Sequence, residues 1–106
     1  MFEAIDPEQL LALRAQSDVV LVDVRTDAEV ARGVIPGARH IPLFSLPQRA
    51  GELDSAATIV VYCQSGGRSA QACMHLAREG YSHLYNLSGG ILAWARAGLE
   101  ISMPNS

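Results

Sequence analysis

The chain has 106 residues, of which 49% are hydrophobic, and a formal net charge of −3 at pH 7. A chain of this length is expected to form one domain over residues 1–106, with a tail from about 101, and to bury roughly two-thirds of its unfolded surface. Because its net charge is negative, the protein has no overall positive potential that would attract nucleic acid. No apolar run approaches the roughly 20 residues that span a bilayer, so neither nucleic acid nor a membrane is an expected partner.

Two cysteines, Cys63 and Cys73, are too few for a disulfide framework. The amino terminus carries acidic residues (Glu3, Asp6 and Glu8) where a signal peptide would carry a basic patch followed by an apolar run. We therefore expect a cytoplasmic location.

Strand and helix signals alternate along the first half of the chain. Residues 19–22 form a continuous apolar run, which is typical of a strand covered on both faces. Asp suits a helix N-cap, and Pro suits the first helical position. The expected elements are a strand over 2–5, a helix from Pro7 with Asp6 as its N-cap, the strand over 19–22, and a short helix through Arg32 that Thr26 or Asp27 caps and Gly33 ends.

The second half continues the alternation. Pro47 and Gly51 allow only short helices between residues 42 and 53. The expected elements are a short strand over 38–41, a strand over 58–62, a helix over 69–79, a strand over 83–87, and a helix over 89–97 with Ser88 as its N-cap and Trp94 in the core.

Cys63 follows directly on the run Thr58–Tyr62, which is β-branched except for Tyr62, and Gly66-Gly67 breaks that pattern before the next helix. The cysteine is therefore expected at the carboxyl end of a strand, in a tight turn that leads into a helix amino terminus. Ligands of open α/β sheets bind at this edge. Backbone N–H groups that point inward from such a loop, together with the helix dipole, favour an anion at its centre.

The group at the centre of this loop is the sulfur of Cys63. Its thiolate should be favoured, with Arg68 adding positive charge, so the pKa of Cys63 should fall below that of a free thiol. The loop thus describes an activated nucleophile. His40, His75 and His83 lack metal-ligand spacing, and the chain has neither a dinucleotide fingerprint nor a Walker loop. We expect no metal and no organic cofactor.

Cys63-x4-Arg68-Ser69 with its flanks resembles the active-site loop of the rhodanese (sulfurtransferase) family. The resemblance extends from about Ile5 to Ile101. It rests on Asp23-Val24-Arg25 with Glu29, Gly33 to Ala38, Ile41-Pro42, Gly80-Tyr81, Leu87 to Gly90, Trp94 and Gly98-Leu99. Two departures are that Val34 stands where the family usually has His, and that Gln64 and Ser65 stand where many members carry a basic residue.

The resemblance implies an α/β fold: a central five-stranded parallel sheet in the order 1-5-4-2-3, with helices on both faces. It also implies sulfur transfer from a donor such as thiosulfate, through a Cys63 persulfide, to cyanide or a thiol, including a protein thiol such as that of thioredoxin. Cys63 and Arg68 are the expected catalytic residues. Substrate binding is assigned to Gln64, Ser65, Gly66, Gly67 and Ser69, and a supporting role to Asp23 and Arg25.

Three roles have alternatives at this point. Arg68 could bind the sulfonate end of the donor, which we favour, or hold the loop through backbone carbonyls. Asp23 could hold the loop and Arg25 could face the pocket. In a structural role, which suits the family pattern better, Arg25 would instead pair with Glu29 while Asp23 accepts backbone N–H bonds.

Two other functions compete with sulfur transfer. A related phosphatase family, with arsenate-reductase chemistry, shares the fold, but its loop resembles Cys-x5-Arg. The shorter loop here favours a single sulfur over a tetrahedral oxyanion. A module that carries sulfur to a protein partner, or that only docks one, is the other alternative.

Overall fold

The computed structural model describes residues 1–104. Its five strands form one parallel sheet in the order β1-β5-β4-β2-β3, which confirms the predicted fold and strand order. The strands are β1 (Phe2–Ile5), β2 (Val19–Asp23), β3 (Arg39–His40), β4 (Thr58–Tyr62) and β5 (Leu84–Leu87).

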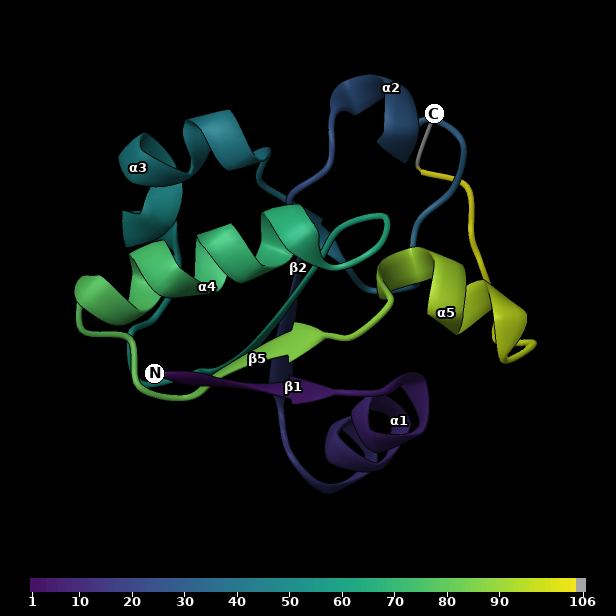
Figure 1. The fold of residues 1–106 in the computed structure, drawn as a ribbon, viewed down its shortest axis with the longest axis horizontal. Coiled ribbons are helices and arrows are strands. Elements are labelled where there is room, and N and C mark those ends of the chain that lie inside the picture. The colour runs from purple at the N-terminus through teal and green to yellow at the C-terminus, as the bar shows by residue number, and fades with distance from the viewer. Residues whose placement is uncertain (105–106) are drawn as a thin grey trace.

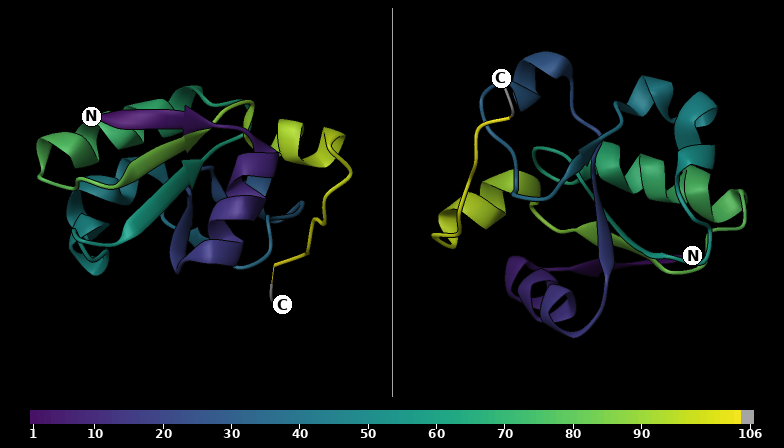
Figure 2. Two further views of the ribbon diagram at one scale, coloured as in Figure 1. Left: turned by 90° about the horizontal axis from the view of Figure 1, so that it is seen from below. Right: turned by 180° about the vertical axis from the view of Figure 1, so that it is seen from behind.

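Helices cover both faces of the sheet (Figures 1 and 2). One core cluster joins α3 and α4 to one face through Leu46 and Leu76, and the other joins α1 and α5 to the opposite face through Leu10 and Trp94. The helices are α1 (Pro7–Gln16), α2 (Asp27–Val30), α3 (Leu46–Arg49), α4 (Gly67–Arg78) and α5 (Gly90–Arg96), with 3-10 turns at Leu43–Ser45 and Ala50–Glu52.

Side chains of the central strand β4 alternate between the two cores. Ile59 and Val61 belong to the cluster under α4, whereas Val60 and Tyr62 belong to the cluster under α1 and α5. This period of two explains why the whole run is apolar, since both faces of the strand are covered. Asp23 is aligned with Tyr62 in the β2–β4 register, so both strands end at the same edge of the sheet.

The predicted start of the first helix is confirmed. The Asp6 carboxylate accepts the backbone N–H of Gln9, the Gln9 side chain accepts that of Asp6, and Pro7 is the first helical residue. Thr26 caps α2 in the same way with Glu29, although this helix ends at Val30 and not at Arg32. The last strand begins at Leu84, one residue later than predicted.

The predicted cap of α5 is wrong. Gly89, and not Ser88, precedes the helix, and no side chain caps it. Ser88 still continues the pairing with β1, since its N–H donates to the Ile5 carbonyl at 2.7 Å. Trp94 lies in the core as expected, 3% exposed, with its ring N–H donating to the Glu100 carbonyl.

The predicted tail, 101–106, is held at Ser102, which forms an antiparallel bridge with Val34. Residues 105–106 of this tail lie outside the described residues. Within residues 1–104, no helix is long and apolar enough to cross a bilayer.

Candidate active site

Cys63 directly follows β4 and is 1% exposed. Its sulfur faces back into the loop that it begins: the Gly66 N–H donates to Sγ at 3.0 Å, and the Ser69 hydroxyl lies 3.4 Å from Sγ. Gly66 adopts φ +116, which L side chains rarely adopt, and this conformation turns the chain into α4. The helix begins at Gly67, two residues earlier than predicted.

Burial opposes ionisation of the Cys63 thiol, because a charged thiolate is poorly solvated there. The Ser69 hydroxyl and three backbone N–H groups outweigh that penalty, so the pKa of Cys63 is lowered. The N–H groups are those of Ser69, Gly66 and Ser65. The arrangement stabilises a negative charge on sulfur.

Cys73 provides the contrast within the same molecule. It lies on α4, fully buried, and burial raises its pKa to about 12. The thiolate is the nucleophilic form of a cysteine, and the two pKa shifts favour that form at Cys63 over Cys73.

Asn86 on β5 lies behind the loop, and the sequence reasoning missed it. It is 8% exposed; its amide nitrogen donates to the Gly66 carbonyl at 3.1 Å, and its amide oxygen accepts from the Ser69 hydroxyl. Asn86 therefore contacts two of the residues that donate toward the Cys63 sulfur. The signal that could have found it is a polar residue inside the otherwise apolar strand 84–87.

The amino terminus of α5 supports the loop from another side. The N–H groups of Ile91 and Leu92 donate to the carbonyls of Cys63 and Gln64 at 3.0 and 3.2 Å. These contacts satisfy helix N–H groups that a side-chain cap would otherwise serve. The start of α5 lies so close to the loop that a Cβ on Gly90 would be 2.4 Å from both carbonyl oxygens.

Arg68 forms a two-pronged ion pair with Glu29, with Nη1–Oε1 2.7 Å and Nη2–Oε2 2.8 Å. Hydrogen bonds from Arg68 lower the pKa of Glu29 to about 2. The two roles expected for Arg68 were donor binding and loop holding, and neither included Glu29 as its partner. Gln64, Ser65 and Gly67 lie exposed at the surface of the loop, whereas Gly66 and Ser69 are buried.

Asp23 and Arg25 form a buried pair beside the loop. The Arg25 guanidinium holds Asp23 with Nη2–Oδ2 2.7 Å and Nε–Oδ1 3.0 Å, and it also donates to the Gly33 carbonyl. Asp23 accepts the backbone N–H of Arg25, as the structural alternative predicted. The predicted pairing of Arg25 with Glu29 is made only through the backbone. Arg25 Nη1 donates to the Glu29 carbonyl at 3.5 Å, whereas the Glu29 carboxylate is occupied by Arg68.

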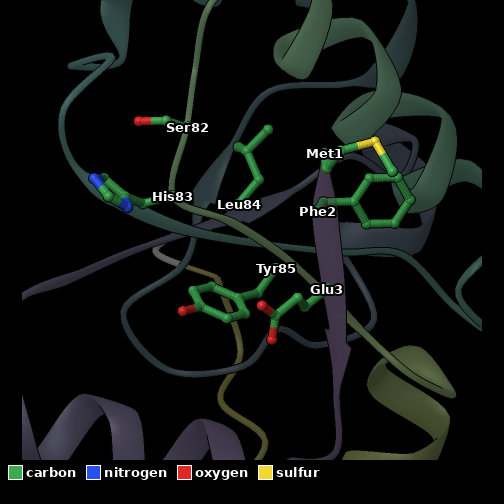
Figure 3. A pocket seen from close by; sticks show the side chains of 7 residues that line it. All are labelled: Met1, Phe2, Glu3, Ser82, His83, Leu84 and Tyr85. Carbon is green, nitrogen blue, oxygen red and sulfur yellow. The ribbon is translucent and has the colours of Figure 1, made fainter.

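A hollow of about 290 Å³ is lined in part by Arg25 and Arg68. Phe44, at its wall, is 78% exposed. The lining residues are Val24, Arg25, Thr26, Pro42, Leu43, Phe44 and Arg68. A second hollow, shown in Figure 3, lies where β1 and β5 begin and includes Phe2, His83 and Tyr85. Because these residues are at the amino-terminal ends of the strands, that hollow is at the edge opposite to Cys63.

The sequence and the structure both match known proteins. The model of the rhodanese-like domain family matches residues 6–97 of this chain. A sulfurtransferase of Allochromatium vinosum is 48% identical over 105 residues, covering 98% of each chain. The thiosulfate sulfurtransferase GlpE of Pseudomonas putida is 37% identical over 93 residues, covering 88% of this chain and 84% of its own. The crystal structure of a rhodanese-like domain protein from Staphylococcus aureus superposes with a TM-score of 0.83 at 34% identity, covering 92% of this chain and 96% of its own.

These matches define an α/β domain of the sulfurtransferase type. The chain belongs to the rhodanese-like domain family.

Proposed function

We propose that this protein is a sulfurtransferase in which Cys63 carries the transferred sulfur as a persulfide. The observation that supports this most directly is the position of Sγ, within 3.0 Å of the Gly66 N–H and 3.4 Å of the Ser69 hydroxyl. A lowered pKa at Cys63 agrees with it. The names of the relatives from Allochromatium vinosum and Pseudomonas putida point to the same chemistry.

The reaction has two steps. The Cys63 thiolate attacks the outer sulfane sulfur of the donor, the sulfur–sulfur bond of the donor breaks, and its electron pair leaves with the rest of the donor, as sulfite when the donor is thiosulfate. A thiophilic acceptor, cyanide or a thiol, then attacks the outer sulfur of the persulfide, and Cys63 leaves as a thiolate. This is covalent catalysis with ping-pong kinetics, and no step calls for a metal or an organic cofactor.

The loop supports this chemistry through its donors. The N–H of Gly66 and the hydroxyl of Ser69 stabilise the thiolate as leaving group in the second step. Gln64, Ser65 and Gly67 form the exposed side of the loop, where the donor and the acceptor approach. Asp23 and Arg25 have a supporting role, in which Arg25 ties the end of β2 to the Gly33 carbonyl. The single domain over residues 1–106 and the cytoplasmic location stay predictions.

Loop length favours sulfur over oxyanion chemistry. Four residues separate Cys63 from Arg68, and a wider cradle is expected around a tetrahedral phosphate or arsenate. The main competitor is therefore a domain that carries sulfur to a protein partner through the same persulfide.

Mass spectrometry after brief exposure to a donor in excess tests the proposal. Thiosulfate and an organic persulfide should each be tried, and at least one should add a single sulfur atom to Cys63, which cyanide then removes. Cys73→Ala is the matched control and should still be loaded, because a buried thiol with a raised pKa takes no part in the reaction. Wild-type turnover in a Cys63→Ser variant would contradict the mechanism.

A further inference from the structure

Arg68 is the only basic residue of the loop, and its guanidinium is already occupied. Two of its N–H groups bind the two Glu29 oxygens at 2.7 and 2.8 Å, the fork geometry in which arginine holds a carboxylate most firmly. Glu29 is held in turn, since its Oε1 also accepts the backbone N–H of Thr26 at 3.0 Å. The positive charge nearest to the nucleophile in sequence is thus neutralised by a fixed partner.

Arg25, the other arginine that lines the adjoining hollow, is occupied as well. It is 5% exposed and binds Asp23 and the Gly33 carbonyl. Both guanidinium groups at this hollow therefore face carboxylates of the protein. The remaining wall is made by Thr26 and by the apolar residues Val24, Pro42, Leu43 and Phe44.

These surroundings suit some sulfur donors better than others. Thiosulfate ends in a strongly hydrated oxyanion, and its binding requires charged or hydrogen-bonding groups that replace the lost water. An organic persulfide with an uncharged carbon substituent lacks that requirement, and its carbon atoms gain from contact with apolar walls. The hollow adjoins the loop that Cys63 begins, because Arg68 of that loop is one of its lining residues.

Resting on the function proposed above, we propose that Glu29 is a specificity-determining residue. By holding Arg68 it withdraws the cation of the loop from the donor, and the site therefore prefers an organic persulfide, with its carbon substituent in the hollow beside Phe44, over thiosulfate. In this reaction the Cys63 thiolate attacks the outer sulfur of the persulfide, the sulfur–sulfur bond breaks, and the organic thiolate leaves with the electron pair. The Cys63 persulfide formed is the same with either donor.

The test compares kcat/KM for thiosulfate and for benzyl persulfide, with cyanide as the common acceptor. Glu29→Gln removes the charge that holds Arg68, while the Gln amide oxygen can still accept the Thr26 N–H that starts α2. The ratio of kcat/KM for thiosulfate to that for benzyl persulfide should rise about tenfold or more, the effect of one charge-assisted hydrogen bond regained by the donor. In Glu29→Gln combined with Arg68→Gln, this rise should disappear.

Phe44→Ser tests the hollow independently. The side chain is largely exposed, so folding should survive its loss. The KM for benzyl persulfide should rise several-fold relative to the KM for thiosulfate, because the apolar wall is shortened.

The inference is overturned if Glu29→Gln leaves the donor ratio at its wild-type value, or if the rise persists without Arg68. An unchanged KM ratio in Phe44→Ser would exclude the hollow as the site of the carbon substituent. Failure of the proposed function is distinguishable from both results, since in that case neither donor would load sulfur onto Cys63 in the wild-type protein.

Discussion

At the scale of single residues, Asn86 has the most consequential contacts outside the loop itself. Its amide binds Gly66 through the nitrogen and Ser69 through the oxygen, and both of these residues donate toward the Cys63 sulfur. The Ser69 hydroxyl has one proton, for which the Asn86 oxygen, the Gly66 carbonyl and the Cys63 sulfur compete. Asn86 is therefore positioned to set how well the loop stabilises the thiolate.

Asn86→Asp should raise the pKa of Cys63 by on the order of one unit. The carboxylate adds a like charge near the thiolate and loses the N–H that the Gly66 carbonyl accepts, and both changes act in the same direction. The measurement is the thiolate absorbance as a function of pH, with the rate of persulfide formation near neutral pH expected to fall in parallel.

Gln16→Glu is the control for the Asn86 variant. It makes the same change in net charge at an exposed position at the end of α1, away from the edge that carries Cys63. An unchanged Cys63 pKa in Asn86→Asp, with the fold intact by circular dichroism, would show that Asn86 does not act on the thiolate.

Residues such as Asn86 and Glu29 could not be assigned their partners from the sequence. Asn86 reaches the loop because β5 pairs with β4 in the register that aligns it with Val61, and that register is a property of the assembled sheet. Glu29 and Arg68 are 39 residues apart, so their pairing depends on how the turn after β2 meets α4. Cys63 itself was identifiable because the strand, the glycines and the helix around it are all local signals.

At the scale of secondary-structure elements, the loop is held between α4, which it begins, and α5, whose first N–H groups bind its carbonyls. This second contact explains the glycine at the first position of α5. Gly90 adopts φ +58 and lies so close to the Cys63 and Gln64 carbonyls that no side chain fits.

Gly90→Ala should destabilise the protein by more than about 1 kcal/mol, because both its φ and its space exclude a Cβ and the colliding atoms are backbone. Gly67→Ala is the matched control in the same region. Its Cβ would meet nothing within 4 Å, and it lies at the start of α4, where Ala favours the helix. Chemical denaturation measures the free energy of unfolding of both variants.

A Gly90→Ala variant as stable as wild type would mean that the contact between α5 and the loop is easily adjusted. If Gly67→Ala lost as much stability as Gly90→Ala, the cause would be general sensitivity of the loop and not the close approach.

Elements with strong local signals were predicted well, and elements that depend on tertiary contacts less so. The start of α1 follows from Asp6 and Pro7 alone, and β4 follows from its apolar run. By contrast, the N-cap predicted at Ser88 was wrong, because the carbonyls of Cys63 and Gln64 serve the N–H groups of α5. The strand order came from the family resemblance and not from the pattern of residues.

At the scale of the whole molecule, the Arg68–Glu29 pair connects the first half of the chain to the second beside the nucleophile. Glu29 belongs to the helix after β2, and Arg68 belongs to the helix after β4. Since β2 and β4 are neighbours in the sheet, the pair joins their two connections across the edge that carries the site. The same pair that we infer to select the donor thus also ties the two halves together.

The contribution of this pair to stability should depend on pH. The folded pKa of Glu29, about 2, lies below its ordinary value of 4.5, chiefly because Arg68 donates to it. The native state therefore binds this proton less readily than the unfolded state, so the stabilisation is complete above the ordinary pKa and is lost as the pH falls toward the folded pKa. Glu29→Gln should lower the melting temperature near neutral pH, and the deficit relative to wild type should shrink between about pH 5 and about pH 2.

Glu52→Gln is the control, because its pair with Arg49 lies exposed within one turn of chain and should contribute little. A deficit in Glu29→Gln that stays constant over this range would show that the ion pair is not what the substitution removes.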